Sequence, residues 1–395
     1  MKKKIVFMVI NMNVGGTEKA LLNMIAEMPK DQYDITILML EKYGGFLKDI
    51  PDYVRIEYVK GFGQIKEIIN NPPHFTVLDL LKKGCLMKAI TILSIYVTTK
   101  ITNDKSLFYN YLLKDASKLV GEYDVAVAYA GPMDLISFFV AKKIKAKQKI
   151  QWVHFDVTKI GFSNKFASKI YKEFDKVFVV SEEARKKLLR AVPTIKKKTE
   201  VFLNITSPTK IQSQSKKGKG FDDNFDGLRI LTVGRLAAEK GQDLAIDVLN
   251  KLIKKGHNVR WYCIGDGSSR LKYEEKIKQN NLEGNFILLG SHTNPYPYMD
   301  QCDIYVQPSR YEGYCITLSE ARCLSKAIVT TNVNGAKEQI TSGKNGLITD
   351  ISVAGIFKAV EELVKDEAMR VKFEDSLSKE IINYETEMKK FLSII

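Results

Sequence analysis

Two basic side chains stand close together in a glycine-bounded segment of the second half of the chain. Residues 234–241 read G-R-L-A-A-E-K-G, and this segment carries Arg235 and Lys240. An apolar, strand-like run at 229–233 precedes the segment, and a helical pattern at 242–255 follows it. The start of a helix favours an anion, because its free N–H groups and its dipole present positive charge there. We therefore expect Arg235 and Lys240 to hold a phosphate or diphosphate beside the backbone of Gly234.

Two carboxylates follow in a second segment of the same half. Residues 308–321 read P-S-R-Y-E-G-Y-C-I-T-L-S-E-A, directly after the apolar run 304–307. Glu312 falls in the predicted loop, and Glu320 falls in the first turns of the next predicted helix. Gly313 allows the backbone to approach a ligand closely. The N–H groups expected to face a phosphate are those of Cys315, Ile316 and Thr317. Carboxylates repel a diphosphate, so the two glutamates should instead accept hydrogen bonds from sugar and ribose hydroxyls.

Short apolar runs alternate with helical patterns throughout the chain. The runs of the first half are nearly continuous in hydrophobicity, which indicates strands covered on both faces of a parallel sheet. These strands are predicted at 4–10, 34–40, 124–130, 150–155 and 176–181, with helices at 18–28, 133–144 and 182–190. The second series of strands is predicted at 229–233, 259–264, 286–289, 304–307 and 327–331, with helices at 242–255, 269–279, 317–325 and 353–365.

This alternation predicts an α/β protein with two Rossmann-like, doubly wound lobes that face a central cleft. The polar stretch 211–224 has no apolar period and is typical of a linker. We expect an N-terminal acceptor-side lobe over 1–205, a linker over 206–227 and a C-terminal donor-binding lobe over 228–380. A last helix over 381–395 would return to the N-terminal lobe.

In this order the motifs resemble those of the retaining glycosyltransferases of family 4, which have the two-lobed GT-B fold. The resemblance covers most of the chain, and it is closest to bacterial capsule and surface-polysaccharide enzymes. It rests on the segments 234–241 and 312–320, on G-D-G at 265–267, on N-G-x-x-E at 334–338 and on G-G-T-E at 15–18. One departure is Tyr314-Cys315, where many relatives have Phe-Gly, and the larger side chain puts the local backbone fit and the choice of sugar in question.

The resemblance implies a role for each matching residue. Arg235 and Lys240 would hold the donor diphosphate, Glu312 would meet the donor sugar, and Glu320 would meet the ribose. His154, which follows a predicted strand of the first half, would lie near the sugar. The backbone positions implied in donor binding are Gly15, Gly16, Gly234, Gly265, Gly313, Cys315, Ile316 and Thr317. We predict catalytic roles for Glu312, His154, Arg235 and Lys240.

The motifs of several other enzyme classes are missing. The sequence has no Asp-x-Asp, and its four histidines are not paired at metal-binding spacing. G-x-S-x-G, the P-loop and H-E-x-x-H are also absent, and the loop at 11–16 lacks the dinucleotide fingerprint. We therefore predict a metal-independent hexosyltransferase that needs no cofactor.

The net charge of +15 is concentrated in the first half, where residues 1–200 carry 34 basic and 21 acidic side chains. Residues 201–220 add four lysines, and the remainder is −2. Such asymmetry indicates an anionic partner, although a general excess of lysine is an alternative. Residues 74–110 mix periodic apolar positions with Lys82, Lys83 and Lys88, which predicts either a helix on an anionic membrane surface or a helix packed on the sheet.

The sequence thus predicts a transferase that moves a hexosyl group from a nucleotide diphosphate sugar, most simply a UDP-sugar, to a lipid-linked saccharide. The pathway would be surface polysaccharide assembly. The five cysteines form no C-x-x-C pair and the first apolar run is too short for a signal peptide, so we expect a cytoplasmic protein, peripheral on the inner face of the cell membrane. No nucleic-acid partner is expected. The alternatives are a sugar-nucleotide epimerase on the same fold and a non-catalytic partner subunit.

Overall fold

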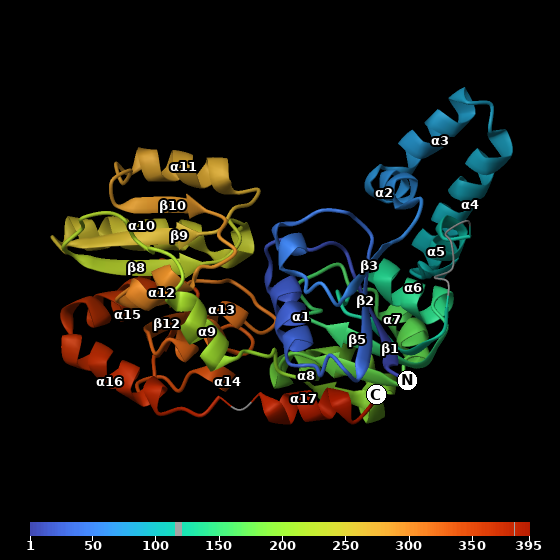
Figure 1. Cartoon of the computed structure of the whole chain (residues 1–395). Helices are drawn as coiled ribbons and strands as arrows, with labels where there is room; N and C mark the ends of the chain where they lie inside the picture. Colours follow the sequence, from blue (N-terminus) through green and yellow to red (C-terminus); the bar gives the residue numbers. More distant parts are fainter. Residues whose placement is uncertain (115–120, 383) are drawn as a thin grey trace.

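A computed structural model describes residues 1–114, 121–382 and 384–395 of the chain. Two parallel β-sheets lie side by side, and helices cover both of their faces (Figure 1). The predicted fold class, with two Rossmann-like α/β lobes, is confirmed.

The first sheet has seven strands in the order β3-β2-β1-β4-β5-β6-β7, and every neighbouring pair is parallel. Its strands are β1 Lys3–Val9, β2 Tyr33–Met39, β3 Arg55–Tyr58, β4 Tyr123–Ala128, β5 Ala146–Val153, β6 Lys176–Val179 and β7 Thr199–Val201. The five strands predicted in this half are present, with ends that differ by a few residues. Apolar side chains from both faces of this sheet form one core.

Helices of the first lobe connect these strands. They are α1 Gly16–Ala26, α2 Phe62–Asn70, α3 Pro73–Lys82, α4 Leu86–Thr102, α5 Ser106–Leu112, α6 Asp134–Lys143, α7 Asn164–Ile170 and α8 Glu182–Ala191. The start of α8 is set by Ser181, whose hydroxyl accepts a hydrogen bond from the N–H of Ala184 at 3.1 Å.

The second sheet has six parallel strands in the order β10-β9-β8-β11-β12-β13. Its strands are β8 Leu228–Val233, β9 Val259–Ile264, β10 Phe286–Gly290, β11 Ile304–Gln307, β12 Ala327–Thr331 and β13 Leu347–Thr349. The helices around it are α10 Gln242–Lys254, α11 Arg270–Gln279, α12 Tyr296–Gln301, α13 Ile316–Cys323, α14 Ala336–Gln339, α15 Val353–Lys365 and α16 Glu367–Ser378.

In both sheets the strand order reverses beside the first strand of the lobe, between β1 and β4 and between β8 and β11. Ligands of open α/β sheets bind at this position, outside the carboxyl ends of the strands. The loops after β8 and β11 are the two segments that carry Arg235, Lys240 and Glu312. The fold therefore places the predicted site where a doubly wound sheet holds its ligand.

The segment 206–227, predicted as a linker between the lobes, contains one helix. Helix α9, Pro208–Ser215, occupies this region, and its Ile211 side chain is buried in the second lobe. Polar residues dominate the segment, so its single buried position produces no apolar period in the sequence.

The segment around 74–110 does not pack on the sheet as one helix. Helices α3 and α4 form a hairpin that extends away from the first lobe, on the side opposite the second lobe (Figure 1). Most apolar side chains of this segment, such as Leu86, Ile90 and Leu93, are about half exposed. Of the two alternatives raised from the sequence, a helix packed on the sheet is therefore excluded for these positions.

The last helix, α17 Glu385–Leu392, lies against the first lobe although the chain reaches it from the second (Figure 1). Its Met388 and Phe391 side chains are buried in the core of the first lobe. The carboxylate of Glu387 accepts a hydrogen bond from the N–H of Leu203 at 2.9 Å. Across the described residues, no helix combines the length and the hydrophobicity that a membrane span requires.

Candidate functional site

The loops after β8 and β11 pack tightly against each other, because the two strands are neighbours in the sheet. Gly241 joins the first loop to α10 with a left-handed backbone, φ 73°. A Cβ atom at this position would lie 2.0 Å from the carbonyl oxygen of Pro308. Only glycine satisfies both conditions, so it fixes the distance between the two loops.

Lys240 and Glu312 form a direct ion pair across these loops. The Lys240 ammonium donates hydrogen bonds to both carboxylate oxygens of Glu312, at 2.7 and 2.8 Å. The side chains keep 22% and 9% of their exposure. Burial is the largest influence on the pKa of Lys240 and acts to lower it, but the charge and hydrogen bonds of Glu312 and the neighbouring Cys315 together outweigh burial and raise the pKa. Lys240 therefore carries its positive charge in a mostly buried position.

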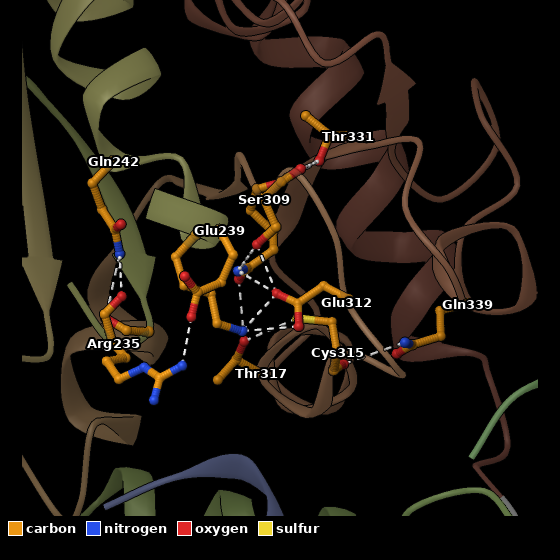
Figure 2. Close-up of polar contacts among 12 residues, drawn as sticks. Arg235, Glu239, Gln242, Ser309, Glu312, Cys315, Thr317, Thr331 and Gln339 are labelled. Atoms are coloured by element: carbon orange, nitrogen blue, oxygen red, sulfur yellow. Dashed lines mark hydrogen bonds and ion pairs between the residues drawn. The ribbon is translucent and has the colours of Figure 1, made fainter. Parts of the chain in front are cut away.

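Two further side chains hold the Glu312 carboxylate in place (Figure 2). The Ser309 hydroxyl donates to its Oε1 at 2.6 Å, and the Gln307 amide donates to the same oxygen at 3.4 Å. Gln307 in turn accepts a hydrogen bond from the hydroxyl of Thr317 at 3.1 Å. Gln307 and Ser309 are fully buried, and sequence reasoning did not select either of them.

Arg235 lies at the open edge of the site. Its side chain is 62% exposed, and its guanidinium pairs with Glu239 rather than with the Lys240–Glu312 pair (Figure 2). Its backbone carbonyl accepts a hydrogen bond from the Gln242 amide at 3.0 Å, which holds the backbone of the loop. Gly265, after β9, has its α-carbon against the same loop, since a Cβ there would lie 2.0 Å from the carbonyl oxygen of Gly234.

Glu320 lies on the buried face of α13, with 3% of its surface exposed. Burial raises the pKa of Glu320, while the positive charge of Lys19 and the hydroxyl of Tyr296 counteract this rise. The Tyr296 hydroxyl donates to its Oε1 at 2.7 Å. Glu320 is therefore a buried, hydrogen-bonded residue of α13 and not a surface acid of that helix.

The start of α13 faces the glycine loop of the first lobe. A Cβ at Gly16 would lie 3.3 Å from Cγ2 of Ile316, so the two helices approach closely at this point. The Cys315 sulfur lies 3.2 Å from the Thr317 hydroxyl. Burial raises the pKa of Cys315 to about 12, so this residue is a neutral thiol rather than a nucleophile.

His154 directly follows β5, and its backbone contacts Gly313 of the second lobe. A Cβ at Gly313 would lie 1.8 Å from the backbone oxygen of His154, so a larger residue would separate the lobes here. The Ser181 hydroxyl also donates to the carbonyl oxygen of Gly313, at 3.1 Å. His154 is itself buried, and burial lowers its pKa to about 3. Its imidazole is therefore neutral, and its Nε2 atom has no hydrogen-bond partner among the described residues.

Glu18, the last residue of the G-G-T-E segment, lies in the first turn of α1. Burial raises its pKa to about 7, against the lowering effects of a backbone hydrogen bond and of the Arg235 charge. Its carboxylate approaches the preceding loop, since a Cβ at Gly15 would lie 2.5 Å from its Oε2 atom. Glu18 therefore belongs to the same charged surroundings as Arg235.

The N-G-x-x-E segment joins the two lobes. The Glu338 carboxylate accepts hydrogen bonds from the N–H groups of Glu182 and Glu183, at 3.0 and 3.4 Å, where α8 begins. This is a favourable place for a negative charge, because it lies at a helix N-terminus.

A second polar contact between the lobes centres on Asp156. Its carboxylate accepts from Lys187 at 2.8 Å and from Asn334 at 2.9 Å. Burial acts to raise the pKa of Asp156, but these donors and Thr158 lower it. The site lies between lobes that are held together by specific polar contacts.

The structure thus gathers most of the predicted residues between the lobes. Lys240 contacts Glu312, and Gly313 contacts His154. The Arg235 side chain instead pairs with Glu239, and Glu320 lies on the buried face of α13. Within the described residues, no group of His, Cys, Asp or Glu has the arrangement of a metal site.

Comparisons with known proteins bear on the family and on the fold. Residues 214–380 match the family model of the glycosyl transferases group 1. A Campylobacter jejuni relative, N-acetylgalactosamine-N,N'-diacetylbacillosaminyl-diphospho-undecaprenol 4-alpha-N-acetylgalactosaminyltransferase, is 27% identical over 52% of this chain and 56% of its own. The Staphylococcus aureus capsular polysaccharide biosynthesis glycosyltransferase CapM is 30% identical over 40% of this chain and 41% of its own. The chain thus spans less than two thirds of the length of these curated relatives.

A solved structure is similar over the whole chain. A variant of TarM from Staphylococcus aureus, in complex with Fondaparinux, alpha-GlcNAc-glycerol and UDP, aligns with a TM-score of 0.71. The alignment covers 99% of each chain at 17% identity, and at this identity it shows a shared fold. The two lobes together have the GT-B fold, and residues 214–380 are similar to the glycosyl transferases group 1.

Proposed function

We propose that the protein is a retaining glycosyltransferase of family 4 that moves a hexosyl group from a UDP-sugar to a hydroxyl of a lipid-linked saccharide. The observation that carries this proposal is the Lys240–Glu312 pair at the switch point of the second sheet, facing the first lobe at His154. A diphosphate that enters here would meet the ammonium of Lys240, and a sugar would meet the carboxylate of Glu312.

In this proposal the donor separates the ion pair. Lys240 and Arg235 would bind the diphosphate oxygens, together with the N–H groups at the start of α13. Such preorganised positive groups stabilise a leaving diphosphate directly, and this is usually the largest contribution to catalysis. They would do so without a metal ion. Glu312 would then be free to accept hydrogen bonds from the sugar hydroxyls.

The acceptor would approach from the first lobe. The neutral His154 imidazole offers a hydrogen bond to a sugar hydroxyl through its unpartnered Nε2. In retaining enzymes of this family the acceptor is thought to attack the face that the diphosphate leaves, so the chain needs no separate general base. The name of the Campylobacter relative, which includes a diphospho-undecaprenol saccharide, supports a lipid-linked acceptor, and the name of CapM supports assembly of a capsular polysaccharide. An acceptor held in the bilayer would place the protein in the cytoplasm, peripheral on the inner face of the membrane.

The proposal is tested first by a thermal-shift screen against UDP-, GDP- and ADP-sugars. Because a ligand at about 100 times its Kd adds about 2.7 kcal/mol, the true donor should raise the Tm clearly. Product should then form only when a saccharide acceptor is supplied, with the anomeric configuration of the donor. Rearrangement of the donor without acceptor would instead show an epimerase.

A further inference from the structure

The hairpin of α3 and α4 extends away from the body of the first lobe, and its connecting turn lies at its far end (Figure 1). The two helices pack on each other, and the buried side chains of α4 are Ala89 and Ile92. Such packing accounts for one side of the hairpin only.

The other side of α4 is an exposed apolar stripe. Its members recur every three or four residues, which places them on one face of the helix. They are Leu86, Ile90, Leu93, Val97 and Ile101, with exposures of 57%, 53%, 48%, 45% and 79%. On α3 and at the turn, Phe75, Leu78, Leu81 and Met87 are exposed as well. A continuous exposed apolar surface of this kind marks an interaction site.

Lysines surround the end of this stripe. Lys82, Lys83 and Lys88 stand at or beside the turn, and all three are exposed. The hairpin residues 73–102 contain one acid, Asp79, whose carboxylate pairs with Lys83 at 2.7 Å. Within the described residues, no carboxylate pairs with Lys82 or Lys88. The far end of the hairpin is therefore both apolar and positively charged.

We propose that this hairpin docks on an anionic lipid bilayer, with Leu86, Met87 and Ile90 among the acyl chains and the lysines at the headgroups. An apolar face flanked by lysines is the pattern of helices that lie in a membrane interface. A second copy of this chain is a poorer fit, because self-association would bring lysines together without acids to neutralise them. The inference deepens the proposed function and rests on its lipid-linked acceptor, which a docked enzyme would reach in the plane of the bilayer.

The experiment is co-sedimentation of the full chain with vesicles of phosphatidylcholine containing about 30% phosphatidylglycerol. Wild-type protein should bind these vesicles and not vesicles of phosphatidylcholine alone, and binding should weaken as salt rises from about 0.05 to about 0.5 M. The triple substitution Lys82→Glu, Lys83→Glu and Lys88→Glu should weaken binding by at least about 100-fold, from the loss of three headgroup contacts.

A second variant tests the apolar part of the surface. The combined Leu86→Ser, Met87→Ser and Ile90→Ser change should also weaken binding at least about 100-fold, since it removes the buried side chains. These residues are exposed in the free protein, so the Tm should not fall. Binding that survives this variant would show that charge alone attracts the protein and would overturn the proposed insertion.

The matched control reverses three exposed lysines of the same lobe, Lys186, Lys196 and Lys197, which lie between β6 and β7 in the chain. These strands form one edge of the first sheet, and β3, which precedes the hairpin, forms the other. This variant has the same net charge as the first and should bind vesicles within about twofold of wild type. Equal loss in both, or no binding by the wild type, would overturn the proposal. A wild-type dimer that the serine variant converts to a monomer would assign the surface to a second copy instead. UDP binding by each variant is measured in parallel, so that failure of docking and failure of the proposed function remain distinct.

Discussion

The ion pair between Lys240 and Glu312 should contribute to the stability of the second lobe as well as to its chemistry. Removing one partner of a fully buried pair costs about 3–5 kcal/mol, because the remaining charge is left without compensation. Lys240 retains 22% of its exposure, and Ser309 still donates to the carboxylate at 2.6 Å. We therefore expect Lys240→Met to lower the unfolding free energy by about 2 kcal/mol.

The measurement is a double-mutant cycle with Lys240→Met, Glu312→Gln and the combined variant, each followed by thermal and urea unfolding. A loss of about 2 kcal/mol corresponds to a Tm lower by about 4–8 °C for a lobe of this size. The combined variant should recover about 1–2 kcal/mol of the summed losses, because the charge left behind in each single variant is then absent.

A surface pair provides the control for this cycle. Lys142 and Glu173 are 2.9 Å apart but keep 42% and 44% of their exposure, so Lys142→Met should cost only about 0.5 kcal/mol. If Lys240→Met lowered the unfolding free energy no more than Lys142→Met, or if the two single losses simply added in the combined variant, the Lys240–Glu312 ion pair would not stabilise the protein and the reasoning would be refuted. The Lys240→Met variant should also lower kcat by about 10²–10³, through loss of one positive group at the leaving diphosphate.

Three further predictions concern other parts of the site. Arg235→Ala should lower kcat by about 10²–10³ and leave stability within about 0.5 kcal/mol of wild type, since its side chain is 62% exposed; steady-state kinetics and a melting curve decide this. Glu320→Gln should chiefly raise the KM for the donor, and a fall in kcat at unchanged KM would exclude a role at the ribose. His154, with a pKa lowered to about 3 by burial, binds a proton only when unfolded between pH 6.5 and 3. The contribution of the neutral His154 to the unfolding free energy is therefore complete above pH 6.5 and declines by up to about 1.4 kcal/mol per pH unit as the pH falls. In urea titrations, the unfolding free energy of His154→Gln should therefore fall less steeply toward acid pH than that of the wild type.

The interior strands could be predicted from the sequence because they are buried on both faces. Their runs of apolar residues are nearly continuous, and strands β9, β11 and β12 begin and end at the predicted residues. The short edge strands β3, β7 and β13 were missed. Each has at most four residues and is at least partly exposed, so neither hydrophobicity nor length distinguishes it from a loop.

The candidate site was predictable as two loops but not as a network. The glycines, the two cations and the two glutamates identify the loops, while the contact of Lys240 with Glu312 spans 72 residues of sequence. The Tyr296 hydroxyl that reaches Glu320 comes from a separate short helix, and no local pattern in the sequence indicates it. Likewise, the apolar positions of α4 resemble those of a packed helix, and only the structure shows that they face outward.

The central claim is that the loops after β8 and β11 bind the diphosphate of a nucleotide sugar. Calorimetric titration of the whole chain with UDP and with uridine tests it most directly, because the two ligands differ only in the diphosphate. We predict that UDP binds much more tightly than uridine, and that Lys240→Met removes most of this difference while Lys142→Met preserves it. Equal affinities for UDP and uridine, or a difference that Lys240→Met leaves intact, would contradict it.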